Sequence, residues 1–255
     1  MYDLYFNIIY IIFIYFLIFF IIGTIIKNNS IVDIGWGMGF FILSLYLIYI
    51  NSFKLDIKTL TNILVLIWGF RLSYHILKRN KKEEDKRYKK WREEWGEWVI
   101  LRAFFQIYLL QGFFMFIIFL PVIIINDINE INNNYYVMIG FIVWIIGFLF
   151  ESISDYQLKI FKKDINNKGK FIKSGLWKYS RHPNYFGESC MWFGIALISY
   201  FITRNIMSFV SPITITFLLL FISGIPLLEK SFEKREGFLE YKEKTSVFIP
   251  WFPKS

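Results

Sequence analysis

Long apolar runs separated by short polar stretches set the pattern of this 255-residue chain. Most runs approach the roughly 20 residues that an α-helix needs to cross the hydrocarbon core of a bilayer. They are continuously apolar, whereas the strands of a membrane β-barrel alternate between apolar and polar residues, so the pattern predicts helices. We therefore expect an all-α polytopic membrane protein with about seven transmembrane helices, near residues 4–26, 31–50, 60–80, 103–125, 135–153, 185–202 and 209–228.

The cations are distributed unevenly among the polar stretches. Residues 78–99, 159–181 and 230–254 hold nearly all of them, whereas residues 126–134 hold none. Seven spans place the three basic stretches on one side of the membrane, and the positive-inside rule assigns that side to the cytosol. The sequence thus predicts an integral membrane protein with its N-terminus outside, its C-terminus in the cytosol and cytosolic loops that can bind a soluble cofactor.

Two local patterns refine this expectation. Trp91, Trp95 and Trp98 recur at helical spacing among charged residues, which is typical of a helix that lies along the membrane surface. Only residues 204–208 separate the last two spans, which predicts a helical hairpin.

Composition removes several classes of function. The single cysteine, Cys190, excludes an intrachain disulfide, and two histidines are too few for a histidine-rich metal site. The net charge of +9 lies in loops beside membrane helices, so nucleic acid is not the expected partner. The chain contains no Gly-x-Gly-x-x-Gly fingerprint, no His-Glu-x-x-His and no Ser-His-Asp order. We expect no metal and no obligate protein partner; the expected partners are membrane lipids and a lipid-like small molecule.

The most informative polar stretch is residues 175–188, which reads Gly-Leu-Trp-Lys-Tyr-Ser-Arg-His-Pro-Asn-Tyr-Phe-Gly-Glu. Pro183 suits the first turn of a helix, where its missing N–H is not needed. The free N–H groups at such a helix start favour an anion. A polar cluster at the mouth of a membrane helix indicates a functional site. The alternative is an interfacial anchor, in which the cations meet lipid phosphates.

Three residues near the first spans are candidates for catalysis. Asp33 stands at the start of a span, where it serves either as a helix N-cap or as a carboxylate that binds or protonates a substrate. Tyr74 and His75 lie about one turn from Arg71, so they can line one helix face and donate a proton. The alternatives are that Arg71 extends to the membrane surface and that His75 is a hydrogen-bonded packing residue.

A second acidic and basic group follows the fifth span. Glu151 and Asp155 are one helical turn apart, and Lys159 and Lys162 come directly after them. Carboxylates can accept hydrogen bonds from sugar hydroxyls while lysines bind phosphates. The alternative is an ordinary solvated helix end.

Taken together, these motifs resemble a bacterial membrane family allied to the steroid 5-alpha-reductase C-terminal domain, within a wider group of sterol reductases and isoprenylcysteine carboxyl methyltransferases. The resemblance covers residue 30 to the end. It is carried by Val32-Asp-Ile-Gly-Trp-Gly37, Trp68-Gly-Phe-Arg-Leu72 with His75 and Arg79-Asn80, Glu84-Asp-Lys-Arg-Tyr88, Leu110-Gln-Gly112, Glu151 with Asp155-Tyr-Gln-Leu158, residues 175–188, Pro226-Leu-Leu-Glu-Lys230, Tyr241 and Ile249-Pro-Trp251. It implies one integral-membrane domain, residues 1–255, with a cofactor-binding half at about residues 140–255, in a bacterial inner membrane.

The resemblance also implies a function and a site. The implied reaction is the NADPH-dependent reduction of a conjugated carbon–carbon double bond in a hydrophobic, steroid-like or other lipid substrate. The implied catalytic residues are Asp33, Tyr74 and His75, and the implied cofactor contacts are Glu151, Asp155, Lys159, Lys162, Trp177, Tyr179, Arg181, His182, Asn184, Glu188, Lys230 and Arg235.

The position of the reductases' proton-donating tyrosine falls near Ile76, so the resemblance leaves the proton donor open. Two other functions stay open as well. The first is a SAM-dependent membrane methyltransferase, because that branch shares an Arg-His-Pro-x-Tyr segment. The second is a lipid-binding or scaffold protein without turnover.

Overall fold

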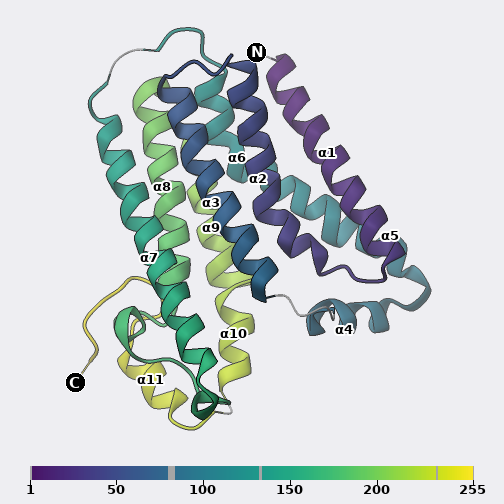
Figure 1. Ribbon diagram of the computed structural model, residues 1–255, viewed down its shortest axis with the longest axis vertical. Helices are drawn as coiled ribbons and strands as arrows, with labels where there is room; N and C mark the ends of the chain where they lie inside the picture. Colours follow the sequence, from purple (N-terminus) through teal and green to yellow (C-terminus); the bar gives the residue numbers. More distant parts are fainter. Residues whose placement is uncertain (1, 80–83, 132–133, 234, 255) are drawn as a thin grey trace. The chain divides into compact units, whose positions relative to one another are not determined.

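A computed structural model describes residues 2–79, 84–131, 134–233 and 235–254 (Figure 1). These residues form helices joined by turns and loops, and seven of the helices are long and apolar enough to cross a membrane. The prediction of an all-helical, polytopic membrane protein is confirmed. The chain forms two compact units, residues 1–132 and 133–255. The predicted cofactor-binding half, 140–255, falls within the second unit, and the assignment of one domain to the whole chain stays a prediction.

The first unit contains the first four spans. Its elements are α1 (Tyr2–Ile25), α2 (Ile31–Ile50), α3 (Ile57–Arg79), α4 (Lys86–Trp95), η1 (Gly96–Trp98), α5 (Val99–Ala103), η2 (Phe104–Leu109) and α6 (Leu110–Asn126). The η1 segment is a 3-10 turn and η2 is a π-helical stretch, so the fourth span is helical throughout but irregular at its start.

Helices α2 and α3 approach closely because each carries a glycine at their crossing. A Cβ atom on Gly37 would lie 2.6 Å from the Gly69 carbonyl oxygen, and one on Gly69 would lie 2.6 Å from that of Gly37. Small residues let membrane helices come together in this way. The core beside this crossing is aromatic, since Phe40 makes an edge contact with the ring of Trp68.

A helix is present in the stretch where one was expected to lie along the membrane surface: it is α4, whose N-cap is Asp85. Its position at the membrane surface stays a prediction. Its Tyr88 is buried, whereas Lys89 and Lys90 are exposed, so the helix has one inward and one outward face. The rings of Trp91 and Trp95 stack at 5.8 Å. Residues 80–83 of the expected range lie outside the described residues.

The second unit contains the last three spans. Its elements are α7 (Val137–Lys163), η3 (Ile165–Asn167), η4 (Gly175–Lys178), α8 (Pro183–Thr203), η5 (Ile206–Phe209), α9 (Val210–Phe217), η6 (Leu218–Ile222), α10 (Ile225–Phe232) and α11 (Phe238–Lys244). Pro183 occupies the first turn of α8, as predicted. The predicted hairpin of the last two spans is present: α8 ends at Thr203 with Arg204 as its C-cap, and the buried hydroxyl of Ser208 donates to Ser199 Oγ across the turn at 2.9 Å.

Two features of this unit differ from the expected spans. Helix α7 continues to Lys163, ten residues beyond the expected end at 153, because the polar residues after Ile153 still favour a helix. The last span is interrupted: a π-helical stretch ends at Ile222, and a new helix starts at Ile225 after the bend at Ser223 and Gly224.

Candidate functional site

Helices α7 and α8 run antiparallel and almost touch at two glycine pairs. A Cβ on Gly187 would lie 2.5 Å from the Gly147 carbonyl oxygen, and one on Gly194 would lie 2.6 Å from that of Gly140. The spacing of seven residues on both helices places both pairs on one seam. The close approach brings the residues that follow Gly147 on α7 beside the first turns of α8.

That approach assembles four of the predicted site residues. Glu151 and Asp155 on α7 are 3% and 8% exposed, and Glu188 on α8 is 8% exposed. The Asn184 side-chain amide donates to Asp155 Oδ1 at 3.4 Å. We call Glu151, Asp155, Asn184 and Glu188 the α7–α8 polar cluster. Because its three carboxylates are buried, they are not the solvated helix end that sequence alone allowed.

The amide oxygen of Asn184 gives the cluster a possible binding role. Asn184 Oδ1 is buried and accepts no hydrogen bond from the described residues. The hydroxyl of Ser189, one residue after Glu188, is likewise buried without a partner among them. Buried polar atoms are nearly always paired, so exceptions often mark places where a ligand or water binds. Carboxylate and amide oxygens suit a ligand that brings hydroxyl donors, such as a ribose.

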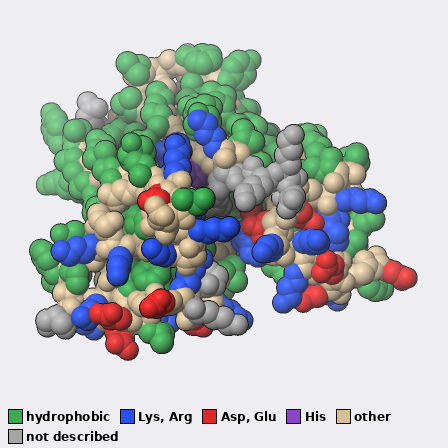
Figure 2. Space-filling model, turned by 60° about the horizontal axis from the view of Figure 1, so that its bottom comes forward, with side chains coloured by type: hydrophobic (Ala, Val, Ile, Leu, Met, Phe, Trp, Pro, Cys, Tyr) green, Lys and Arg blue, Asp and Glu red, His purple; other side chains and the backbone are tan. Residues whose placement is uncertain are grey.

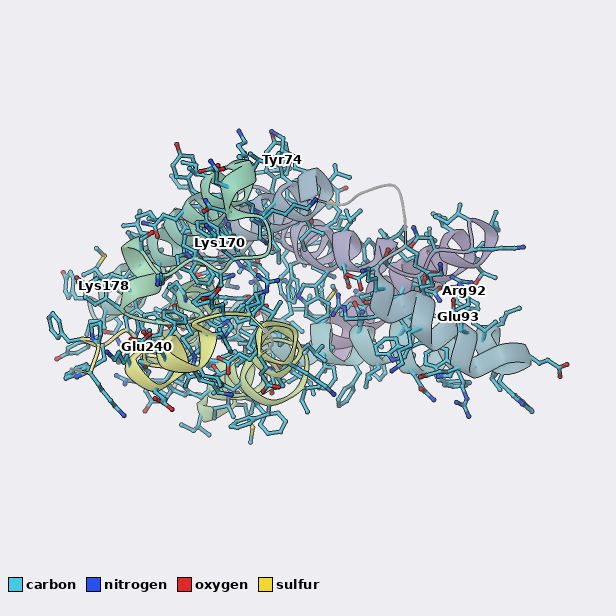
Figure 3. The ribbon with its side chains drawn as sticks, turned by 90° about the horizontal axis from the view of Figure 1, so that it is seen from below. Tyr74, Arg92, Glu93, Lys170, Lys178 and Glu240 are labelled. Atoms are coloured by element: carbon cyan, nitrogen blue, oxygen red, sulfur yellow. The ribbon has the colours of Figure 1, made fainter. Side chains whose placement is uncertain are left out.

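A strongly basic connection joins the two helices of the cluster. Residues 159–181 contain eight lysines and arginines and one acid. The seven lysines in this range are all exposed. Figure 2 shows blue Lys and Arg side chains gathered below a largely hydrophobic zone, and Figure 3 labels Lys170 and Lys178. Such a surface attracts phosphates.

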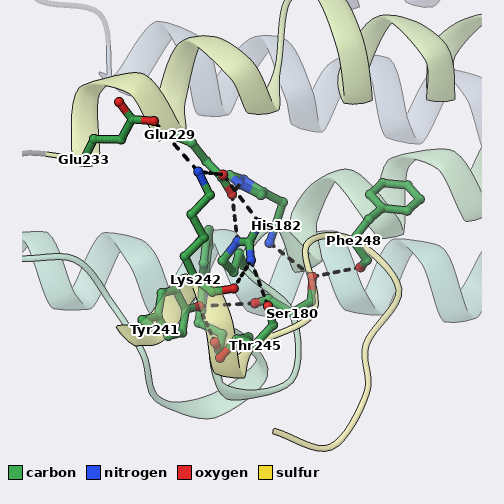
Figure 4. A network of polar contacts seen from close by, with 10 residues as sticks. Ser180, His182, Glu229, Glu233, Tyr241, Lys242, Thr245 and Phe248 are labelled. Carbon is green, nitrogen blue, oxygen red and sulfur yellow. Dashed lines mark hydrogen bonds and ion pairs between the residues drawn. The ribbon is translucent and has the colours of Figure 1, made fainter. Parts of the chain in front are cut away.

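Arg181 binds Glu229, Lys242 and Thr245, which Figure 4 labels, and so holds the C-terminal part of the chain to the start of α8. Its Nε donates to Glu229 Oε1 at 2.7 Å, and its Nη1 donates to the Lys242 and Thr245 carbonyl oxygens at 2.6 and 2.9 Å. The Arg181 side chain is 9% exposed. We call Arg181, His182, Glu229, Lys242 and Thr245 the C-terminal clamp. The predicted cofactor contact by Arg181 stays a prediction, because most of its donors have protein partners.

His182 shares the same carboxylate. Its Nε2 lies 3.1 Å from Glu229 Oε1, and its ring stacks on Tyr185 at 5.6 Å. Burial lowers the pKa of His182 below its ordinary value, although Glu229 opposes this effect. A neutral His182 can still donate its Nε2 proton to Glu229, which leaves Nδ1 as an acceptor.

The other predicted cofactor residues of the second unit fall into two groups. Trp177 is buried, and its indole N–H donates to the Ser154 carbonyl oxygen at 3.2 Å, so it fixes the basic connection to α7. Arg235 donates to the Lys170 carbonyl oxygen at 2.6 Å. Tyr179 is half-buried, whereas the three lysines predicted to contact the cofactor are exposed: Lys159, Lys162 and Lys230.

In the first unit, Asp33 is not an N-cap. The cap of α2 is Ser30, and Asp33 is the third residue of the helix. Its carboxylate accepts hydrogen bonds from Tyr88 Oη at 2.6 Å and Arg87 Nη2 at 3.2 Å. We call Asp33, Arg87 and Tyr88 the Asp33 triad. The N-cap interpretation is wrong because the helix begins two residues earlier, and the substrate-binding role stays a prediction.

Tyr74 and His75 lie near the end of α3. Tyr74 is half exposed, its ring stacks on Phe70, and the Lys78 ammonium lies 4.3 Å from its centre. His75 is half-buried. Their proposed proton transfer stays a prediction.

Four residues with central contacts received no role from sequence. They are Glu229 of the clamp, Arg87 and Tyr88 of the triad, and Tyr241, whose hydroxyl donates to the Trp177 carbonyl oxygen. All four belong to the residues that carry the family resemblance, in Glu84-Asp-Lys-Arg-Tyr88, in Pro226-Leu-Leu-Glu-Lys230 and at Tyr241. That resemblance was the available signal, but it does not say which distant residue each one contacts.

The fold and the cluster define a class: a seven-span helical membrane protein with a buried acidic and amide cluster beside a basic connection. Residues 19–245 match a family described as "Protein of unknown function (DUF1295)". The chain belongs to this family.

Several other proteins are more distantly similar to the chain. A probable O-methyltransferase of Ustilaginoidea virens is 38% identical over 71 residues, 28% of this chain and 25% of that protein. An uncharacterized protein of Schizosaccharomyces pombe is 24% identical over 92% of this chain and 78% of its own length. Human 3-oxo-5-alpha-steroid 4-dehydrogenase 1 is 31% identical over 45% of this chain and 41% of its own length. The chain therefore spans less than half the length of both enzymes. No solved structure matches significantly.

Proposed function

We propose that this protein is an NADPH-dependent reductase of a conjugated carbon–carbon double bond in a hydrophobic substrate. The observation that carries the proposal is the α7–α8 polar cluster, with the unpartnered Asn184 amide oxygen, next to a connection that displays seven lysines. The similarity to the 3-oxo-5-alpha-steroid 4-dehydrogenases supports the same reaction class.

The residues of the second unit fit the two parts of such a cofactor. Asp155, Asn184 and Glu188 offer oxygen acceptors for ribose hydroxyls. Lys159 and Lys162 offer exposed ammonium groups for phosphates. Trp177 and Arg235 act indirectly, because their contacts fix the basic connection in place. Tyr179, His182, Lys230 and Glu151 remain further candidates for contact.

NADPH, when bound, supplies the hydride that reduces the β-carbon of the double bond. The α-carbon must then receive a proton, and the substrate carbonyl must be polarised. Asp33 acts as an acceptor in the described geometry, since Tyr88 and Arg87 both donate to it. Asp33 therefore suits the holding of a polar substrate group, while Tyr74 and His75 remain candidates for delivery of the proton.

A SAM-dependent methyltransferase is the second candidate, and the similarity to the probable O-methyltransferase favours it. The charge of the cofactor distinguishes the two candidate functions. NADPH carries several phosphate charges, whereas SAM has no phosphate and bears a sulfonium cation. Seven exposed lysines therefore favour the phosphorylated cofactor.

A thermal-shift titration of the purified protein with NADPH, NADH, SAM and S-adenosylhomocysteine tests the proposal. A ligand at 100 times its Kd stabilises the folded state by about 2.7 kcal/mol. We expect a concentration-dependent shift with NADPH and a smaller one with NADH. Stabilisation by SAM and S-adenosylhomocysteine but not by NADPH would contradict the proposal and support a methyltransferase.

Variants make the same titration specific to the site. Asn184→Ala should remove the NADPH shift, whereas Asn166→Ala, an exposed asparagine on η3, should retain it. The double variant Lys159→Gln/Lys162→Gln should weaken NADPH more than NADH. The double variant Lys27→Gln/Lys54→Gln, at exposed lysines in the α1–α2 and α2–α3 connections, is the charge-matched control.

A further inference from the structure

The end of the chain presents apolar side chains outward although its backbone is fixed. Ile249, Trp251 and Phe252 are 63%, 70% and 75% exposed. The Trp251 N–H donates to the Tyr179 carbonyl oxygen at 2.8 Å, and the Phe248 carbonyl accepts from Ser180 Oγ at 2.8 Å. We call residues 247–254 the tail segment. Exposed apolar surface on a fixed backbone indicates a contact with a membrane or another protein.

Hydrogen bonds fix the level of the tail segment along α7. The tail is bonded to residues that directly follow η4, and η4 is bonded to α7. The Leu176 N–H donates to Gln157 Oε1 at 3.0 Å, and the Trp177 indole donates to the Ser154 carbonyl oxygen at 3.2 Å. The tail segment is therefore tied to the level of residues 154–157.

That level corresponds to the edge of the hydrocarbon core. Counted from Val137, roughly 20 residues of α7 cross the core and end near Tyr156. Tyr156 is itself an exposed aromatic residue, of the kind found at headgroup level. Trp251 and Phe252 are thus placed where aromatic side chains anchor membrane proteins.

The apolar surface of the tail also continues onto the surface of α7 and α8. The Phe248 ring contacts Phe186 at 5.8 Å, and Phe186 contacts Phe150 at 5.3 Å. In Figure 1 the yellow tail rises from α11 beside the lower part of α7 before it turns to the C-terminus. Nearby on α7, Leu149 and Ile153 are exposed, as lipid-facing residues of a span are.

Cations flank the aromatic residues. Lys178 and Lys254 are exposed, and the Lys254 N–H donates to the Lys244 carbonyl oxygen at 2.9 Å, which brings a third exposed lysine close. Lysines next to tryptophan at the membrane surface bind lipid phosphates. Both the apolar and the charged parts of the tail segment therefore fit the headgroup layer.

We propose that the tail segment is a membrane anchor that inserts Ile249, Trp251 and Phe252 into the headgroup layer of the bilayer that the helices span. Because its backbone is bonded to Tyr179 and Ser180, the anchor holds residues 179–181 at a fixed depth. The proposal is independent of the cofactor and of the reaction.

A spin label at Ile249→Cys tests the anchor in phosphatidylcholine vesicles that contain phosphatidylglycerol. Cys190→Ala supplies the background, since Cys190 is the chain's single cysteine. Collisions with oxygen report lipid, and collisions with a water-soluble nickel complex report water. Ile146→Cys on the exposed surface of α7 is the lipid control, and Lys168→Cys on the basic connection is the water control.

We expect the oxygen-to-nickel ratio at 249 to exceed that of the 168 label several-fold and to stay below that of the 146 label, which lies near the middle of the span. Adding Trp251→Ser and Phe252→Ser should move the 249 label toward water. A ratio equal to that of the 168 label would overturn the proposal. Spin–spin broadening that disappears on dilution with unlabelled protein would also overturn it, because a second copy would then cover the surface.

A measurement without the cysteine background provides an independent check. Phospholipids brominated near the headgroup should quench the tryptophan fluorescence of the unmodified protein more than that of Trp251→Phe. Equal fractional quenching of the two proteins would contradict insertion of Trp251.

Discussion

Each unit contains a carboxylate held by an arginine and a ring donor, and the two differ in burial. Asp33 accepts from Arg87 and Tyr88, and the two ionic side chains are 27% and 41% exposed. Glu229 contacts Arg181 and His182, and its ion pair with Arg181 is 10% and 9% exposed. The ion pair between arginine and carboxylate is therefore partly open to solvent in the first unit and enclosed in the second.

Burial decides what each arrangement does. Removal of one partner from an enclosed pair leaves a charge without compensation, whereas an exposed pair contributes little to stability. The C-terminal clamp is thus a structural fastening between α10, α11 and the start of α8. The Asp33 triad, being partly open, is better suited to exchange a protein partner for a ligand. For the same reason Asn184, and not Arg181, is the better probe of cofactor binding.

Loss of the clamp carboxylate should have the largest effect. Glu229→Ala leaves Arg181 buried without its counter-charge, and we expect a loss of about 3–5 kcal/mol in unfolding free energy. Denaturant unfolding in detergent measures this loss of free energy. In limited proteolysis, the part of the chain after residue 229 should be cleaved faster in Glu229→Ala than in the unmodified protein. Glu233→Ala removes a 53%-exposed carboxylate that also pairs with Lys242, and it is the control. Equal losses of unfolding free energy in Glu229→Ala and Glu233→Ala would show that burial of the carboxylate does not determine its contribution to stability.

Loss of the Tyr88 hydroxyl should have the second-largest effect on the unfolding free energy. Tyr88→Phe keeps the buried ring but removes the hydrogen bond to Asp33, and such bonds to charged groups contribute about 1.5–3 kcal/mol. The loss should appear in the unfolding free energy. Tyr10→Phe, at a 67%-exposed tyrosine of α1, should change nothing. An unchanged Tyr88→Phe protein would mean that the triad is not formed in solution.

The exposed ion pair of the triad should matter less. Arg87→Gln is expected to cost at most about 1 kcal/mol, because Arg87 is 41% exposed and water screens the pair. A double-mutant cycle with Asp33→Asn isolates the pair, and raising the salt concentration should reduce the coupling energy. A coupling energy that is large and insensitive to salt would contradict this account, because the Asp33–Arg87 pair would then behave like the buried Glu229–Arg181 pair.

The smallest expected effect is a dependence on pH through His182. Burial lowers the pKa of His182, so the unfolded chain takes up a proton first as the pH falls. The stability from this group is complete above the ordinary histidine pKa of about 6.5 and decreases as the pH falls from there through the lowered value. His182→Gln should flatten the plot of Tm against pH over this range. A steeper slope after His182→Gln would contradict the sign.

The helices and their order could be predicted from sequence because each span carries its own apolar pattern. The start of α8 at Pro183 followed from the proline, and the hairpin of α8 and α9 followed from the short connection. The π-helical stretch of residues 218–222 and the bend at Gly224 could not be predicted, since both lie within or beside continuous apolar sequence that suits a regular helix equally well.

The candidate site was predictable only in part. The residues of the α7–α8 polar cluster stand out because glutamate, aspartate and asparagine are costly in a membrane helix, and the family resemblance implied their role as cofactor contacts. The partners of Arg181 and Asp33 could not be predicted, because each pairing joins residues about 50 positions apart and depends on how the helices pack. Gly147 and Gly187 set the distance between α7 and α8, yet a lone glycine in an apolar run does not reveal which helix it meets.

The most direct test of the proposed reaction is to follow two labels in one experiment. Membranes that contain the protein, supplied with a panel of conjugated enones, receive NADPH with deuterium on the transferred C4 position and SAM with a ¹³C methyl group. The account predicts deuterium at the β-carbon of a reduced product, absent with Asn184→Ala and retained with Asn166→Ala. Appearance of the ¹³C methyl group in a lipid, with no deuterium transferred, would contradict it.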